Sequence, residues 1–270
     1  MATETSSVRS SSAIWRMLTS DRGAQWTARL LALGIWQVLS DRVVDRLPSP
    51  RETIEIMVLE YQNGDLITNI LVSYRRVGTT LAIVLVLGIL IGSAMGKWMP
   101  ARYYFKDIVF ILVSLPGFIW ALLSVMWWGF SDKGPIVVGV LVATPILAIN
   151  AYQGAQAVPA NLRAMSRAYR VPLRREFRSL TLRSMSEYLF AGFRICVLAG
   201  FGGVLLTEWF GNSEGIGFRQ HYWYDGNNFN GMLGWGIVEI LTIVAIDRFL
   251  FDPLLRRLRA WRVGGEEWSG

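Results

Sequence analysis

Five long apolar runs separated by short polar segments constrain the fold more than any other feature of this sequence. A helix of about 20 apolar residues is as long as the hydrocarbon core of a bilayer is thick. The runs cover residues 77–95, 108–128, 136–152, 188–206 and 232–250, and a shorter run at 30–44 reaches across a bilayer if its helix begins at Trp26. We therefore predict an all-α membrane protein with six transmembrane helices.

The composition agrees with a membrane protein and excludes several other classes. The 270 residues are 53% hydrophobic and only 17% charged. The net charge of +7 lies in loops and tails, whereas nucleic-acid binding needs a continuous basic face. Cys196 is the single cysteine and His221 the single histidine, and they are far apart in the sequence. We therefore predict no catalytic residue, no metal site and no nucleic-acid partner.

The distribution of basic residues predicts the orientation of the chain. With six spans, both termini lie on the same side of the membrane. Of the 27 Lys and Arg residues, 18 fall on that side and seven on the other. Basic loops face the cytoplasm, so both termini should be cytoplasmic. The predicted parts are an N-terminal tail (1–25), a six-span domain (26–258) with a central loop (153–186), and a C-terminal tail (259–270).

Local patterns add detail to the spans. Residues 51–64 form an amphipathic pattern typical of a helix on the membrane surface. Its apolar positions are Ile54, Met57, Val58 and Tyr61. A glycine stripe in the span at 77–95 lets another helix approach closely. This stripe consists of Gly88, Gly92 and Gly96. Pro116 followed by Gly117 should bend the span at 108–128.

The segment 152–187 is the longest polar stretch between two apolar runs. It holds seven arginines and only two glutamates. Apolar residues recur in it at intervals of three to four, which predicts two short amphipathic helices. The break should fall before Pro172, because the residue preceding a proline disfavours the helical conformation. Such a segment is either a solvated loop that satisfies the charge topology or an element that docks on a partner.

A series of short landmarks runs through most of the chain, from about residue 30 to residue 258. In order they are Leu47-Pro48-Ser49-Pro50, Asn69-Ile-Leu-Val-Ser73-Tyr-Arg-Arg76-Val, Leu115-Pro116, Asn150-Ala-Tyr-Gln-Gly154, Ala191-Gly192-Phe-Arg194, Glu208-Trp-Phe-Gly211 and Gly215-Ile-Gly217. Their order and spacing resemble the membrane subunits of ATP-driven ABC importers of the nitrate/sulfonate/taurine class. The resemblance implies a type I ABC importer permease fold in the bacterial cytoplasmic membrane.

The resemblance also implies partners and cofactors. In this family two permeases, identical or paralogous, form a dimer in the lipid bilayer. The dimer works with ABC ATPase subunits and a solute-binding protein. ATP and magnesium would bind to the ATPase, and no cofactor to this chain. Consistent with this, Gly92 to Lys97 is not a phosphate-binding loop, because Trp98 stands where such a loop needs Ser or Thr.

The family's EAA coupling motif, Glu-Ala-Ala followed by Gly and later Leu-Pro, is eroded in this sequence. Alignment on the landmark at 191–194 places Ala164 at the Glu position, Met165 and Ser166 at the Ala positions, and Arg170 at the Gly position. Arginine adopts the turn that glycine permits at this position less readily, so Pro172 is expected to break the helix instead. The coupling residues implied by the resemblance are Leu162, Ala164, Met165, Ser166, Tyr169, Arg170 and Pro172. Either a second permease carries the intact motif, or the ATPase has changed to match this loop.

Polar residues within spans are costly and are therefore candidates for a translocation path. The candidates are Ser114, Trp120, Ser124, Asn150, Gln153, Arg194 and Glu208. Arg194 either grips an anion or extends to the headgroups from the end of its span. Glu208 is expected to pin the outer gate rather than to bind an anion. The aromatic residues Tyr222, Trp223 and Tyr224 either dock the solute-binding protein or form an interfacial belt.

A stand-alone channel or secondary carrier is the alternative function. A carrier would need a deep ion-coupling carboxylate, for which Glu239 is the only candidate, and it would not need an amphipathic docking loop. The sequence leaves the solute open among nitrate, bicarbonate, sulfonates, aromatic carboxylates, pyrimidine precursors and riboflavin-like molecules. It also leaves open whether the permease pair is a homodimer or a heterodimer.

Overall fold

The computed structural model describes residues 21–42 and 47–253, and this part of the chain is helical and contains no strand. In chain order the helices are α2 (Asp21–Arg42), α3 (Pro50–Gln62), α4 (Asp65–Lys97), α5 (Met99–Ser114), α6 (Gly117–Trp128), α7 (Lys133–Gln156), α8 (Ala160–Ala168), α9 (Leu173–Glu176), α10 (Leu182–Gly211), α11 (Ile216–Asp225) and α12 (Phe229–Ile246), with π-helical stretches η1 (Phe177–Thr181) and η2 (Asp247–Phe251). The predicted tails fall largely outside the described residues.

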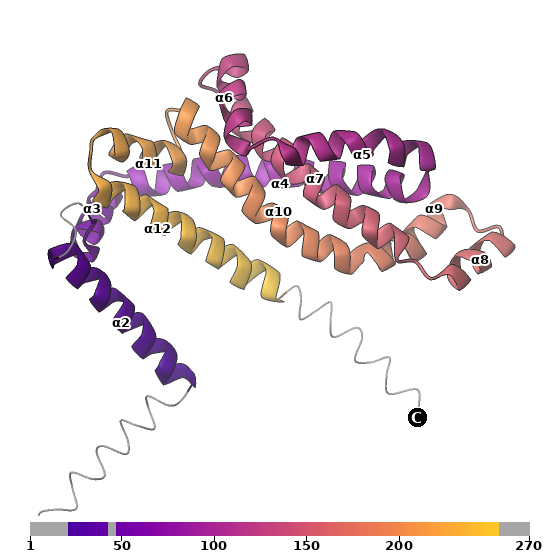
Figure 1. The fold of residues 1–270 in the computed structure, drawn as a ribbon, viewed down its shortest axis with the longest axis horizontal. Coiled ribbons are helices and arrows are strands. Elements are labelled where there is room, and N and C mark those ends of the chain that lie inside the picture. The colour runs from indigo at the N-terminus through magenta and orange to yellow at the C-terminus, as the bar shows by residue number, and fades with distance from the viewer. Residues whose placement is uncertain (1–20, 43–46, 254–270) are drawn as a thin grey trace, which may run out of the picture.

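The helices α4, α7 and α10 pack against one another and form the core of the bundle (Figure 1). The glycine stripe is the contact between α4 and α7. A Cβ atom on Gly92 would lie 2.4 Å from the carbonyl oxygen of Ala148, and one on Gly96 would lie 2.4 Å from the Cβ of Ala155. Any larger residue would force the two backbones apart, so the close helix approach predicted from the stripe is confirmed.

The predicted bend at Pro116 is present and is sharp. The helices α5 and α6 meet at 94°. Leu115 is extended (φ −80°, ψ 126°), as the residue before a proline prefers, so α5 ends at Ser114 and α6 begins at Gly117. The helix before the bend begins at Met99, well before the apolar run that marked it in the sequence. As a result α6 projects from the bundle instead of continuing it (Figure 1).

The described residues contain four helices that are long and apolar enough to span a membrane, or five if the bent pair is one span. The four are Asp65–Lys97, Lys133–Gln156, Leu173–Gly211 and Phe229–Phe249, and the bent pair is Met99–Ser114 with Gly117–Trp128. The sixth predicted span corresponds to α2, whose apolar stretch, Leu31–Ser40, is only about half a membrane span in length.

The two ends of the bundle carry different short helices. In Figure 1, α3 and α11 lie at one end, called the α11 end below, and α8 and α9 lie at the opposite end, called the α8 end. Ser49 caps α3, because its hydroxyl accepts a hydrogen bond from the Glu52 amide at 3.2 Å and Pro50 follows at the first helical position. Most of the predicted apolar face of α3 is exposed, whereas Thr53 and Glu60 are buried.

Candidate functional site

A buried ionic cluster, here named the Arg76 cluster, holds the α11 end together. It consists of Asn69, Ser73, Arg76, Asp132 and Glu208. The Arg76 guanidinium donates to Glu208 at 2.8 Å and to Asp132 at 2.8 Å. Ser73 donates to the same Glu208 carboxylate at 2.8 Å. Arg76 is 4% exposed and Glu208 is fully buried, so their charges are satisfied by protein groups alone.

The Arg76 cluster also fixes the turn between α10 and α11. The Gly215 amide donates to Asn69 Oδ1 at 2.7 Å, and the Gly217 amide donates to Glu208 at 3.0 Å. Gly215 has φ +116°, a conformation that side chains disfavour, and a Cβ atom there would lie 2.4 Å from the Glu208 carboxyl carbon. The carboxylate therefore serves as the anchor of this turn and is not free to bind a solute.

A second buried acid connects α3 to α11. Glu60, 1% exposed, accepts hydrogen bonds from Arg219 at 3.1 Å and from Trp223 Nε1 at 3.1 Å. Of the predicted docking aromatics, Trp223 is thus anchored inward. Tyr222 and Tyr224 are 52% and 48% exposed and remain available on the surface.

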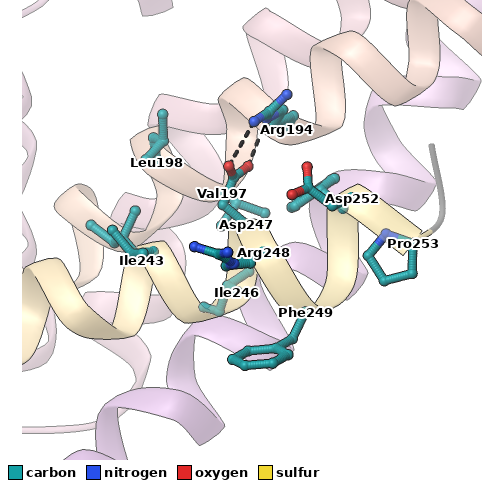
Figure 2. A pocket seen from close by; sticks show the side chains of 12 residues that line it. Arg194, Val197, Leu198, Ile243, Ile246, Asp247, Arg248, Phe249, Asp252 and Pro253 are labelled. Carbon is teal, nitrogen blue, oxygen red and sulfur yellow. Dashed lines mark hydrogen bonds and ion pairs between the residues drawn. The ribbon is translucent and has the colours of Figure 1, made fainter. Parts of the chain in front are cut away.

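Arg194 lines an open cavity of about 680 Å³ between α10 and the C-terminal end of α12. Figure 2 shows its guanidinium pointing from α10 toward Asp247 of η2, with two parallel contacts. Both hydrogen bonds to the Asp247 carboxylate are 2.6 Å long. The two side chains are 43% and 39% exposed, so the pair is accessible from the cavity. The walls are largely aliphatic and include Val197 and Ile243, and Arg248 is a second cation on the rim.

The other predicted path residues do not gather around this cavity. Ser114 donates to the Phe110 carbonyl of its own helix at 2.7 Å, and Ser124 donates to the Ala121 carbonyl at 2.8 Å. Asn150 donates to the Ile146 carbonyl at 2.9 Å and packs under Gly192. Trp120 is half-buried with an unpaired indole nitrogen, and Gln153 is exposed. Within the described residues, only Arg194 of the seven lines the cavity.

The segment that was predicted to form two short helices forms one, α8, followed by a turn and a longer helix. The chain from Leu173 through η1 continues into α10 as one helix that ends at Gly211. The second predicted helix is therefore not separate, because no residue in 177–181 breaks the helix and the π-helical turn absorbs the irregularity.

Arg170 makes the turn that ends α8. It has φ +48°, and its amide donates to the Arg167 carbonyl at 3.1 Å while the Val171 amide donates to the Ser166 carbonyl at 3.0 Å. This is the Schellman arrangement, in which glycine normally holds the left-handed position. The helix breaks before Pro172, as predicted, and Pro172 is the N-cap of α9, but Arg170 itself adopts the left-handed turn that it was expected to avoid.

The exposed side of α8 is apolar at two of the predicted coupling positions. Met165 is 49% exposed and Tyr169 is 79% exposed, and Leu173 beyond the turn is 63% exposed. Ala164, Arg170 and Pro172 are exposed as well, and Leu162 is half-buried. Ser166 is only 2% exposed, so its side chain faces inward and offers no surface to a partner.

Sequence reasoning missed the Arg76 cluster as a unit. Arg76 was named only as part of a landmark, and its partner Asp132 was not singled out. One signal was present: Asn69, Ser73 and Arg76 are spaced four and three residues apart, which places them on one face of a helix. A second signal was that these three residues and Glu208 all lie in the landmarks that carry the resemblance to ABC importer permeases.

Comparison with known proteins agrees with this architecture. Residues 82–259 match the family described as "Binding-protein-dependent transport system inner membrane component". The "Nitrate import permease protein NrtB" of Synechocystis sp. is 27% identical over 247 residues, which cover 87% of each chain. The "Putative aliphatic sulfonates transport permease protein SsuC" of Bacillus subtilis is 23% identical, over 85% of this chain and 84% of that protein.

The fold is also similar to that of solved structures. A chain of the "MetNI methionine ABC transporter", in an inward-facing conformation, superposes with a TM-score of 0.64 at 18% identity. The match covers 72% of this chain and 95% of that chain. It shows that the two share the type I ABC importer permease fold.

A bundle of apolar helices with a basic, partly apolar loop helix at one end is typical of the membrane subunits of transporters. More specifically, this chain belongs to the family of binding-protein-dependent transport system inner membrane components. It is a permease subunit of an ABC importer and not an enzyme, since ATP is hydrolysed by a separate subunit. The reading as a stand-alone carrier is not favoured. Glu239, the carboxylate that reading needed, accepts a hydrogen bond from Gln220 at 3.0 Å.

Proposed function

We propose that this chain forms the translocation path for a small anionic solute and that α8 couples the path to an ABC ATPase. The observation that carries the proposal is the Arg194–Asp247 pair on the open cavity. A guanidinium that already holds a carboxylate by two parallel hydrogen bonds has the geometry needed for nitrate, a sulfonate or a carboxylate. Two relatives bear names that refer to nitrate and to aliphatic sulfonates, which supports an anion.

The orientation in the proposal rests on charge. The loop at the α8 end contains seven arginines between residues 152 and 187, and Lys97, Arg102 and Lys106 lie near the turn from α4 to α5. Basic loops remain on the cytoplasmic side, so the α8 end faces the cytoplasm and the α11 end faces outward. The C-terminus would then be cytoplasmic, and so would the N-terminus with α2 as a sixth span.

On this orientation each end has a partner. Met165 and Tyr169 on α8 would enter a groove of the ATPase, which binds ATP and magnesium, while this chain binds no cofactor. An amphipathic helix with an exposed apolar side is a common ligand for such grooves. Tyr222 and Tyr224 at the α11 end would contact the solute-binding protein. A second permease, identical or paralogous, would complete the path.

The test is to purify the tagged full-length chain from its native host after mild crosslinking and to identify the proteins that accompany it. We expect an ATPase subunit with a phosphate-binding loop, and we expect Tyr169→Asp to abolish its recovery. Tyr61→Asp is the matched control, because Tyr61 is 60% exposed on α3 at the opposite end. Equal recovery of the ATPase with both variants would refute coupling through α8.

The same preparation decides the composition of the permease pair. Recovery of a second permease with an intact Glu-Ala-Ala motif would identify this chain as the degenerate half of a heterodimer. Recovery of this chain as the only permease would mean that the ATPase groove matches the basic loop. Absence of any ATPase would revive the carrier alternative.

A further inference from the structure

A second cavity, of about 410 Å³, lies behind α8 at the α8 end of the bundle. It is bounded by the last two turns of α4, the end of α7, α8 itself and η1. It is separate from the cavity of Arg194, since the two have no lining residue in common. The π-helical stretch η1 contributes Phe177 and Thr181 to its wall, and π-helical turns occur frequently at functional sites.

The wall formed by α4 changes from apolar to charged along its length. Leu90, Ala94 and Lys97 all line the cavity and share one face of α4, because they are spaced four and three residues apart. The rise from Leu90 to Lys97 is about 10 Å. Leu90 is 62% exposed, so the apolar part opens on the outer surface of the bundle, whereas Trp98, which is 57% exposed, follows Lys97 at the charged part.

The charged part of the cavity has an excess of basic residues. Lys97, Arg163 and Arg167 line it together with a single acid, Glu176. None of these three cations forms an ion pair within the described part of the chain. Arg163 is turned into the cavity wall by a hydrogen bond to the Ala155 carbonyl of α7. The cavity therefore combines three cations at one end with a largely apolar wall at the other.

We propose that this cavity binds an anionic phospholipid of the cytoplasmic leaflet. The phosphate lies among Lys97, Arg163 and Arg167, and one acyl chain follows α4 past Leu90. Basic pockets between helices on the cytoplasmic side attract anionic headgroups, and each Lys or Arg near the surface contributes to the attraction. A free anion would use only the charged end of the cavity, whereas a lipid fills both ends. The proposal rests on the cytoplasmic orientation of the α8 end given above.

The bound lipid has a mechanical consequence. Its phosphate bridges Lys97 of α4 to Arg167 of α8, two elements that the protein itself does not join by an ion pair. The lipid thereby braces the helix that faces the ATPase against the helix that crosses the membrane. The tightness of coupling then depends on the anionic lipid content of the membrane.

The experiment measures lipid retention on the full chain, with and without its ATPase, by native mass spectrometry. The protein is titrated with phosphatidylglycerol in micelles that otherwise contain phosphatidylcholine, and with free glycerol phosphate as the soluble anion. We expect Lys97→Gln/Arg167→Gln to weaken phosphatidylglycerol binding roughly 30-fold, because two cations are lost. The control Arg174→Gln/Arg178→Gln removes two exposed charges of the same loop outside the cavity and should leave binding unchanged.

Four results would overturn the proposal. They are equal binding by the two double variants, equal binding of phosphatidylcholine and phosphatidylglycerol, binding of glycerol phosphate as tight as that of the lipid, and loss of the lipid when the ATPase is bound. The last result would mean that a segment of the ATPase fills the cavity. Retention of lipid by a chain that recovers no ATPase would leave the lipid site standing and refute only the coupling role of α8.

Discussion

Arg76 of α4 and Glu208 of α10 lie 132 residues apart in sequence and form a buried ion pair with a nitrogen–oxygen distance of 2.8 Å. Their helices also reach the opposite end of the bundle, where α4 leads to the lipid cavity proposed above and α10 continues from the α8 loop. The 33 residues of α4 correspond to about 50 Å of helix. The pair therefore joins α4 and α10 at the α11 end, and both helices extend to the α8 end. This arrangement is suited to rigid-body tilting of the two helices.

The first prediction concerns this pair. Glu208→Ala leaves Arg76 buried with only Asp132 as an ionic partner, so we expect a loss of about 3–5 kcal/mol in the free energy of unfolding. Arg75→Ala is the control, because Arg75 is 64% exposed and its ion pair with Asp132 is worth about 0–1 kcal/mol. The measurement is thermal or denaturant unfolding of the purified protein in detergent.

A double variant separates the charge from the packing. Arg76→Met/Glu208→Leu removes both buried charges and should recover part of the stability lost in Glu208→Ala, since no unpaired ion remains. Arg76→Met and Glu208→Leu are also measured singly. If their losses simply added in the double variant, the two residues would not be coupled and the cluster would not act as a unit.

Much of the bundle could be predicted because a long apolar run in a membrane must form a helix, and glycines spaced four residues apart on it mark a close contact with another helix. The stripe at Gly88, Gly92 and Gly96 permits only a close helix neighbour, and the structure places α7 there. Pro116 was predicted to bend its span, and the helix is interrupted there. The spacing of the family motif placed Arg170 at the position of the glycine turn, and the left-handed residue after α8 is indeed Arg170. The sequence analysis had expected Pro172 to break the helix in place of that turn.

The parts that escaped prediction depend on contacts between distant segments. Nothing local in the sequence joins Asp132 to Arg76 or Glu60 to Arg219, because the first pair depends on how α4 meets the N-terminus of α7 and the second on how α3 meets α11. The partner of Arg194 was equally invisible, because only the tertiary structure brings Asp247 of η2 beside α10. The start of α5 was missed because its first turns are polar.

The second prediction tests the contact between α4 and α7 with two glycines of the same helix. Gly92→Ala forces a methyl group to within 2.4 Å of the Ala148 carbonyl oxygen, and overpacking of this kind costs roughly 1–3 kcal/mol. Gly78→Ala meets nothing within 4 Å and should be neutral or stabilising by up to about 1 kcal/mol. Unfolding midpoints that move in the same direction for both variants would contradict the packing described.

The third prediction concerns the turn after α8. Arg170→Gly removes a side chain from a left-handed position and should stabilise the turn by roughly 1 kcal/mol. The readout is hydrogen exchange at the amides of Arg170 and Val171, which close the turn, and protection should rise about fivefold. Arg174→Gly is the control of opposite sign, because residue 174 is helical and glycine weakens a helix. Slower exchange in both variants would refute the strain at residue 170.

The fourth prediction addresses the anion site directly. If Arg194 exchanges Asp247 for the solute, then Arg194→Gln should abolish uptake of the transported anion by the reconstituted importer while leaving its assembly with the ATPase intact. Arg248→Gln is the matched control, because it removes the same charge from the rim of the same cavity without breaking an ion pair among the described residues. Asp247→Asn should raise the apparent affinity for the anion, since it weakens the internal competitor for the guanidinium. Uptake that falls equally in the two arginine variants would mean that the cavity attracts anions only through its net charge, and Arg194 would lose its assigned role.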